Sequence, residues 1–407
     1  MKNQLQVGII GAGPAGMMAA LHAAWGGAKV ILFDSNSGVG RKLLVTGSGR
    51  CNLTNTHTDS DRYVCDQPDL LAQLFSHFGR EDLIRTLELI GVLVYHTQDG
   101  WYYPCSDSAA TVVDAFSAAL QQAGVILHLN SRVVGLRKTS RKFIVKVDDA
   151  EWMFDRLIVA AGGKAYPTLG SRGDLHPMLK ELGHTIQPIY PALAPVLADM
   201  RQFHKLQGVR LDVTSQLWEG NALLGETSGN LIFTQWGFNG PAVMDLSHLI
   251  STRPRSQLTL ILNLLPGEME IRLRNLLSQK HAETVPLRVL LGSVLPVKVP
   301  PVVLRLSNLP PEVGMNEIRN QELEGVLHRL THLATDIQGV RGFDYAQVST
   351  GGVPLGEINP ATMESKLIPG LFLAGEVLDV IGPCGGYNLQ FAFSSGAAAG
   401  LGCVVNH

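Results

Sequence analysis

The sequence predicts an α/β fold with an inserted β-rich domain and a small helical domain. Three observations lead to this expectation. The chain opens with the order strand, glycine turn, helix, strand, and it ends with a buried strand, a glycine loop and an alanine-rich helix. Between them, residues 186–266 read as short strands separated by Pro and Gly turns, which is typical of a separate β domain. At 407 residues, the chain is long enough for two or three domains.

The opening segment, "LQVGIIGAGPAGMMAALHAAWGGAKVILFDS", carries a dinucleotide-binding pattern. Gly11, Gly13 and Gly16 form a GxGxxG turn between the strand "VGII" and a helix of small and apolar residues. Asp34 ends the next strand, 23 residues after Gly11, where an acid accepts hydrogen bonds from a ribose. The turn therefore predicts a Rossmann-like domain that holds a pyrophosphate at a helix N-terminus. The plainer alternative is a glycine-rich turn in another βαβ unit.

A basic, glycine-rich loop follows at 37–55, "SGVGRKLLVTGSGRCNLTN". Glycines such as Gly47 leave backbone amides accessible, and Arg41, Lys42 and Arg50 offset phosphate charge. We expect this loop to wrap a diphosphate and the ring beyond it. An ordinary solvated basic loop is the alternative.

The middle of the chain alternates in character. Residues 66–128 read as helices joined by loops, and three or four strands follow up to a buried strand at 156–163, "RLIVAAGG". Ala160 and Gly162 at the end of that strand are expected to approach the same cofactor closely. The expected domains are residues 1–185 and 347–407 for the dinucleotide-binding domain, 186–266 with about 334–346 for the β domain, and 267–333 for the helical subdomain.

The C-terminal segment 369–396 explains what the glycines near the end are for. A buried strand ends at Gly375 and Glu376, so a carboxylate lies at the carboxyl edge of the sheet, where doubly wound folds bind ligands. Gly385 and Gly386 then precede a helix whose N-terminal amides can face the pyrimidine side of a flavin, and that positive end favours the charge of reduced flavin. Asn388 could donate to a ring carbonyl. Close packing of a helix on a sheet is the plainer reading.

Only one GxGxxG turn occurs in the chain. We therefore expect one tightly but non-covalently bound dinucleotide, FAD, and at most a transient visit by NAD(P)H.

Composition narrows the partners. The net charge of −2 argues against nucleic acid and anionic membranes, which both require a basic field. Five scattered cysteines without a CxxC pair indicate free thiols, no metal site and, with no leader before the first strand, the cytoplasm. The histidines are expected to provide no pair at metal-ligand spacing on one helix.

Several motifs together resemble the YhiN-like (BaiN/RdsA-type) NAD(P)/FAD-dependent oxidoreductases: "GAGPAG", "GRKLLVTGSGRCNLTN", "VSTGGV" and "MESKLIPGLFLAGEVLDVIGPCGGYNLQFAFSSG". The resemblance runs from end to end. It implies an FAD domain of the type with two dinucleotide-binding domains, built from both chain ends, with inserted β and helical domains. Position by position, it points to FAD contacts at Ala15, Asp34, Arg41, Lys42, Gly47, Val133 (through its backbone, at the adenine), Glu376, Asn388 and Leu389. We also count Arg50, Cys51 and Asn52 of the "GRCN" motif as cofactor-binding residues.

Two positions depart from the family pattern. Its β domain usually reads FTH-x-G-x-S-GPA, whereas "FTQWGFNGPA" places Gln235 at the histidine and Asn239 at the serine. Proton transfer by that histidine is therefore not expected here. Cys384, where relatives often have threonine, is expected with Cys51 near the ring, where a thiol–flavin exchange would require a thiolate. Packing as small hydrophobic side chains is the plainer role.

Three functions fit these features. The first is an FAD-dependent oxidoreductase that passes hydride from NAD(P)H through flavin N5 to a small, largely apolar substrate such as an activated alkene. The second is a flavin oxidase of a small amine or amino-ketone that releases hydrogen peroxide. The third is an FAD-holding redox sensor without turnover. The residues leave the catalytic groups, substrate, electron donor and oligomeric state open.

Overall fold

The structure is a computed structural model that describes residues 4–405. Backbone contacts divide the chain into two units: the first runs to Tyr190 and resumes at Gln347, and the second is Pro191–Ala346. The expected boundary at 185 lies five residues before this division. The expected helical subdomain, 267–333, belongs to the second unit.

The first unit is built on a parallel sheet with the order β19-β10-β1-β2-β6. Every neighbouring pair in it is parallel, and its strands are mostly buried apolar runs, as expected where helices cover a parallel sheet. In chain order, the strands are β1 (Gln6–Ile10), β2 (Lys29–Phe33), β6 (Ile126–His128), β10 (Arg156–Val159) and β19 (Leu371–Leu373).

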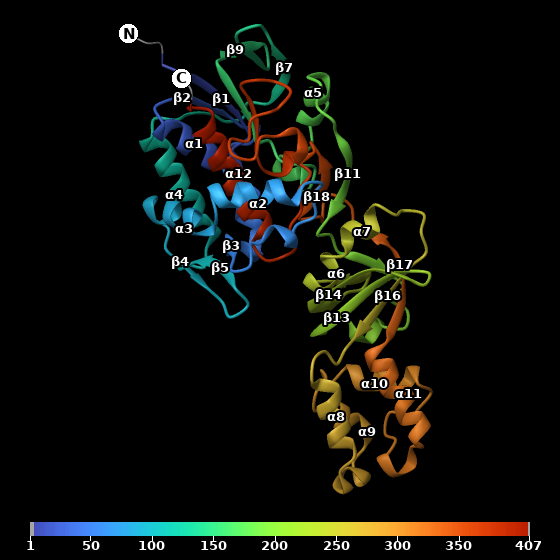
Figure 1. The fold of residues 1–407 in the computed structure, drawn as a ribbon. Helices are drawn as coiled ribbons and strands as arrows, with labels where there is room; N and C mark the ends of the chain where they lie inside the picture. Colours follow the sequence, from blue (N-terminus) through green and yellow to red (C-terminus); the bar gives the residue numbers. More distant parts are fainter. Residues whose placement is uncertain (1–3, 406–407) are drawn as a thin grey trace. The chain divides into compact units, whose positions relative to one another are not determined.

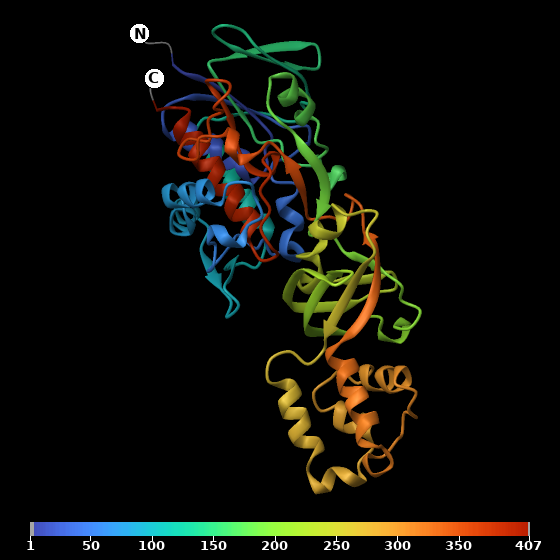
Figure 2. The same ribbon diagram turned by 45° about the vertical axis from the view of Figure 1, so that its right-hand side comes forward.

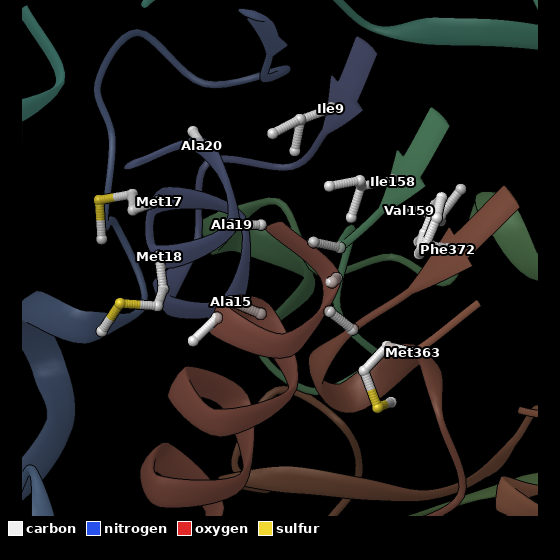
Figure 3. Packing of buried hydrophobic residues seen from close by; sticks show 14 of the residues in the cluster. Ile9, Ala15, Met17, Met18, Ala19, Ala20, Ile158, Val159, Met363 and Phe372 are labelled. Carbon is white, nitrogen blue, oxygen red and sulfur yellow. The ribbon is translucent and has the colours of Figure 1, made fainter. Parts of the chain in front are cut away.

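Helices α1 (Pro14–Trp25) and α12 (Tyr387–Gly402) come from opposite ends of the chain and lie side by side (Figures 1 and 2). A Cβ on Gly396 would lie 2.3 Å from the carbonyl oxygen of Ala15, and one on Gly400 would lie 2.4 Å from that of Ala19. The small residues of the two helices therefore allow backbone-to-backbone packing. Figure 3 shows Ala15 and Ala19 of α1, which belong to the same buried cluster as Ile158 and Phe372 of the neighbouring strands.

Smaller elements complete this unit. The remaining helices are α2 (Pro68–His77), α3 (Arg80–Leu89), α4 (Ala109–Gln122) and α5 (Leu175–Glu181). Three small sheets accompany them: β3 (Thr54–Asn55), β5 (Trp101–Pro104) and β4 (Val94–His96); β7 (Val133–Lys138), β8 (Phe143–Val147) and β9 (Ala150–Phe154); and β11 (Gln187–Ala192) with β18 (Val348–Gly352). The β4–β5 hairpin corrects the expectation of helices and loops over 66–128. Its aromatic run "WYYP" has high strand propensity but is too short to show a strand period.

The second unit contains a closed six-stranded barrel with the order β12-β15-β14-β13-β16-β17. Its strands are β12 (Val196–Ala198), β13 (Arg210–Glu219), β14 (Ala222–Phe233), β15 (Gly237–Asn239), β16 (Leu258–Asn263) and β17 (Leu333–Val340). Its helices are α6 (Pro241–Met244), α7 (Ser247–Ser251), α8 (Met269–Leu277), α9 (Leu287–Leu291), α10 (Val299–Leu306) and α11 (Asn320–Thr331). Within residues 4–405, no helix combines the length and apolarity needed to cross a membrane.

Candidate functional site: a dinucleotide cradle

The glycines of the first turn serve two different purposes. Gly11 has φ +101°, and a Cβ there would lie 2.4 Å from the carbonyl oxygen of Ala160. A Cβ on Gly16 would lie 1.8 Å from the carbonyl oxygen of Gly11. By contrast, a Cβ on Gly13 would meet no described heavy atom within 4 Å. Packing of the chain explains Gly11 and Gly16, whereas Gly13 faces open space that a ligand can fill.

Helix α1 presents its positive end to that space. It begins at Pro14 after Gly13, and within the described residues no side chain caps it. The amides of Ala15 and Gly16 lie in the first turn, where a helix offers them no carbonyl acceptor. Unpaired amides and the helix dipole suit a pyrophosphate, so this end of α1 fits the phosphates of FAD.

Asp34 fixes the shape of the glycine turn. Its Oδ2 accepts a hydrogen bond of 2.7 Å from the amide of Ala12, and its Oδ1 accepts bonds from the amide and side chain of Asn36. A carboxylate has about four acceptor positions, so capacity for a ribose hydroxyl remains. The ribose contact stays a prediction.

The expected adenine position lies next to Asp34. The amide of Ser131 donates to the carbonyl of Asp34 at 2.8 Å, and the amide of Asn130 donates to that of Asn36 at 2.9 Å. Val133, buried at the start of β7, follows two residues later. The chain therefore brings the residues expected around the adenosine together.

Lys42 and Glu376, which are 334 positions apart in the sequence, form an ion pair. The Lys42 Nζ atom lies 2.6 Å from Glu376 Oε2, and both side chains are largely buried. Glu376 Oε1 accepts hydrogen bonds of 2.9 Å from both the amide and the hydroxyl of Ser349. The carboxylate expected to hold ribityl hydroxyls is thus already bound on both oxygens by the protein. Its ribityl contact stays a prediction.

The basic loop continues through Leu43–Gly49, where short 3₁₀ turns are interrupted by a kink at Thr46, Gly47 (φ +55°) and Ser48 (φ +57°). Arg50 is exposed and lies over the ring of Tyr103, with its guanidinium carbon 4.2 Å from the centroid. Arg41 is exposed too. These arginines remain accessible to an anion.

Cys51 and Asn52 are buried beneath this loop. Burial raises the pKa of the Cys51 thiol to about 12, so the thiol is protonated at neutral pH. This supports packing over a thiolate reaction for Cys51. Cys384 is half-buried.

The C-terminal glycine loop lies against the "NLTN" segment. Gly385 (φ +115°) receives a hydrogen bond of 2.9 Å on its carbonyl from the Asn55 side chain. A Cβ on Gly386 (φ +95°) would lie 2.4 Å from the carbonyl oxygen of Thr54. Thr54 also donates to buried Gln390 in the first turn of α12. These contacts therefore connect the N-terminal "NLTN" segment with the C-terminal glycine loop and the start of α12.

Asn388 and Leu389 have protein contacts of their own. The Asn388 side chain accepts from the amide of Gly382 at 2.9 Å and donates to its carbonyl at 2.8 Å. Leu389 is half-buried and packs on the core. Asn388 thus closes the 382–388 loop, and its donation to a flavin carbonyl stays a prediction.

A third close approach lies at the end of β10. Ala160 is buried, and Gly162 (φ +75°) faces the Ser171 hydroxyl, which is buried and has no hydrogen-bond partner among the described residues. Gly375 (φ +72°) lies against Ala15, since a Cβ there would be 2.9 Å from the Ala15 Cβ. The unpartnered hydroxyl, the open space at Gly13 and the uncapped N-terminus of α1 are compatible with a bound FAD, and the individual contacts stay predictions.

Four further residues contact the candidate site and were not predicted from the sequence. Ser349 anchors Glu376, and Gln390 anchors Thr54. Trp101 lies on Gly385, whose Cβ would be 3.1 Å from the indole nitrogen. Asp379 accepts a hydrogen bond of 2.7 Å from the amide of Gly351, and burial raises its pKa. Only the "VSTGGV" and "GEVLD" motifs themselves could have drawn attention to Ser349 and Asp379.

His184, Glu357 and Ser365 form a hydrogen-bonded group that resembles the acid–histidine–serine triad of a hydrolase. His184 lies 2.6 Å from Glu357 Oε2 through Nδ1 and 3.0 Å from the Ser365 hydroxyl through Nε2. The Ser365 oxygen is buried and also accepts hydrogen bonds from the amides of Leu367 and Ile368. A buried, fully bonded hydroxyl cannot reach a substrate, so these three residues stabilise the fold and do not form an active site.

The two departures from the family pattern lie in the second unit. Gln235 is exposed in the turn between β14 and β15, and the Asn239 side chain accepts a hydrogen bond of 2.8 Å from the amide of Gly240. Asn239 therefore shapes the turn into α6.

One histidine pair comes near to metal-ligand spacing. His328 lies in α11 and His332 directly follows the end of that helix at Thr331, with ring centroids 4.4 Å apart. Among residues 4–405, no group of three or more potential ligands forms around them or elsewhere.

Comparison with known proteins decides the family. The HI0933-like protein Rossmann domain matches residues 5–402. The chain belongs to this family. It is 33% identical over 402 residues to the 3-dehydro-bile acid delta(4,6)-reductase of Clostridium scindens, covering 97% of this chain and 98% of that protein. It is 30% identical over 390 residues to the ribosomal RNA dihydrouridine synthase of Escherichia coli, covering 95% of each.

A solved structure shares the fold. The 3-ketosteroid delta1-dehydrogenase of Sterolibacterium denitrificans aligns over 100% of both chains, with a TM-score of 0.53 at 11% identity. The predicted fold class and family are confirmed. The protein is an FAD-dependent oxidoreductase of this family, as the sequence predicts.

Proposed function

We propose that the protein reduces a carbon–carbon double bond conjugated to a carbonyl group, with NAD(P)H as the electron donor. The observation that carries this proposal is a likeness over nearly the whole chain to two proteins whose names describe one chemistry. By their names, both relatives reduce a carbon–carbon double bond, one in a 3-dehydro bile acid and the other in a uridine of ribosomal RNA. When bound, FAD supplies the two-electron hydride chemistry that such a reduction requires.

The residues of the cradle have distinct parts in this proposal. The amides of Ala15 and Gly16 bind the pyrophosphate and Arg41 offsets its charge, while Lys42 is paired with Glu376. Gly385 and Gly386 bring the positive end of α12 toward the ring. Asn55, Thr54 and Gln390 keep that end in place through the hydrogen bonds described above.

We propose a small, largely apolar substrate. An enone ring is planar and carries one acceptor oxygen, so a mostly apolar pocket with few polar groups suffices to orient it. Two relatives are named as ribosomal RNA dihydrouridine synthases. A uridine-containing RNA is therefore the second substrate to test.

The test begins with the purified yellow protein under anaerobic conditions. NADH and NADPH are added separately, and the loss of flavin absorbance is followed in a stopped-flow instrument. Bleaching by one of them, followed by recovery of colour with a cyclic enone, supports the proposal. Absence of bleaching by either donor refutes it. Peroxide formation from an amine panel without nicotinamide would favour the oxidase, and bound flavin that reacts with no donor would favour the sensor.

A further inference from the structure

An arginine and two aromatic residues form a cluster at one end of the barrel. Arg341 follows β17, and its amide donates to the carbonyl of Pro195 at 2.8 Å. Its guanidinium carbon lies 3.2 Å from the ring centroid of Tyr345 and 4.9 Å from that of Trp236. All three residues belong to the second unit.

The backbone holds each member of this cluster in place. The amide of Tyr345 donates to the carbonyl of Gly342 at 3.0 Å, in a turn that returns the ring to Arg341. The carbonyl of Trp236 accepts from the amide of Ala198 at 3.2 Å. These bonds fix the backbone of the 341–345 loop and of the turn that carries Trp236, and the two ring contacts hold the guanidinium before any ligand arrives.

Arg341 has aromatic partners, whereas four other arginines of this unit are paired with carboxylates. Arg201, Arg274, Arg288 and Arg319 each pair with a carboxylate at 2.7 Å or closer. Within residues 4–405, no carboxylate lies within 4.0 Å of the Arg341 guanidinium, and its N–H groups donate no hydrogen bond that the structure records. The aromatic rings stabilise the cation through their faces and leave the N–H edge available.

We propose that Arg341, Trp236 and Tyr345 form a binding site for an oxyanion carried by a planar, apolar body. A guanidinium edge matches a carboxylate or a phosphate in bidentate fashion, and the two rings offer apolar contact to the rest of the ligand. Tyr345 is 48% exposed, so the site is accessible from solvent. This inference is independent of the reductase proposed above.

The test uses the full-length, FAD-loaded protein and isothermal titration calorimetry at constant ionic strength. Benzoate and phenyl phosphate are the probes, which distinguishes a carboxylate site from a phosphate site, and sodium chloride is the ionic control. Saturable binding of one probe is expected. Arg341→Gln is expected to weaken it at least about tenfold, because a charge-assisted hydrogen bond contributes about 1.5–3 kcal/mol.

Matched variants make the result specific. Arg201→Gln removes a charge of the same unit that is already paired with Asp199, and binding should stay within about twofold of the wild type. Tyr345→Ala removes an exposed ring and should weaken binding several-fold, while Tyr345→Phe should preserve it. No saturable binding to the wild type, equal binding to Arg341→Gln, or an equal effect of chloride would overturn the proposal. If Arg341→Gln does not fold, the tyrosine pair decides.

Discussion

The Nζ atom of Lys42 lies 2.6 Å from Oε2 of Glu376, and the two residues are 334 positions apart in the chain. Lys42 comes from the basic loop after β2, and Glu376 comes from the segment after β19. Ser349 binds the other carboxylate oxygen. A single contact therefore joins three segments that the sequence keeps far apart, at the carboxyl edge of the parallel sheet.

Breaking this ion pair should lower the stability of the protein. Lys42→Met leaves the largely buried Glu376 carboxylate without its cation and should lower the free energy of unfolding by about 1–2 kcal/mol. Adding Glu376→Gln should restore part of this loss, because the unpaired charge is then gone. Urea unfolding of the four proteins of this double-mutant cycle gives the coupling energy. A coupling of zero would show that the pair does not contribute.

The glycine turn allows a sharper separation of fold from ligand. Gly13→Ala meets no protein atom and has φ −78°, so the apoprotein should keep its thermal midpoint while FAD affinity falls by about tenfold or more. Gly11→Ala is the matched control: it places a Cβ 2.4 Å from the Ala160 carbonyl oxygen and should destabilise the apoprotein itself. Flavin titration and thermal unfolding measure the two effects. Unchanged FAD affinity in Gly13→Ala would place the pyrophosphate elsewhere.

Stability should fall in mild acid because of His22. Burial lowers the pKa of His22 from 6.5 to about 4, so between these pH values the unfolded chain binds a proton that the folded chain excludes. The free energy of unfolding therefore decreases as pH falls from about 6.5 to 4. The His22→Phe variant should show a weaker dependence over this range in urea titrations. An identical slope in both proteins would assign the effect to other groups.

The buried thiols should be inert. Burial raises the pKa values of Cys51 and Cys403 to about 12, so neither forms an appreciable thiolate at pH 8. Iodoacetamide should label exposed Cys105 and leave these two unmodified in the folded protein, as peptide mass spectrometry would show. Rapid labelling of Cys51 would restore the thiol–flavin exchange as a possibility.

The sequence predicts the glycine motifs of the candidate site better than the hydrogen bonds that connect its segments. The GxGxxG turn and the glycine pair are visible because a backbone that must approach a neighbour closely excludes a Cβ, and this leaves a local signature. The partners of Asp34, Glu376 and Asn388 leave none. Their hydrogen bonds to Ala12, Ser349 and Gly382 depend on side-chain directions that emerge only when distant segments fold together. The β4–β5 hairpin escaped for a related reason, since a strand of four residues carries almost no periodicity.

The most direct test of the account is a single anaerobic turnover. The protein is first reduced with one equivalent of NADH or NADPH, whichever bleaches it, and then mixed with a cyclic enone. If the protein reduces enones, the flavin colour returns without oxygen, and mass spectrometry finds the saturated ketone in an amount equal to the enzyme. The proposed function would be contradicted if the reduced protein stayed colourless with every cyclic enone and with uridine-containing RNA. It would then regain its colour only in air.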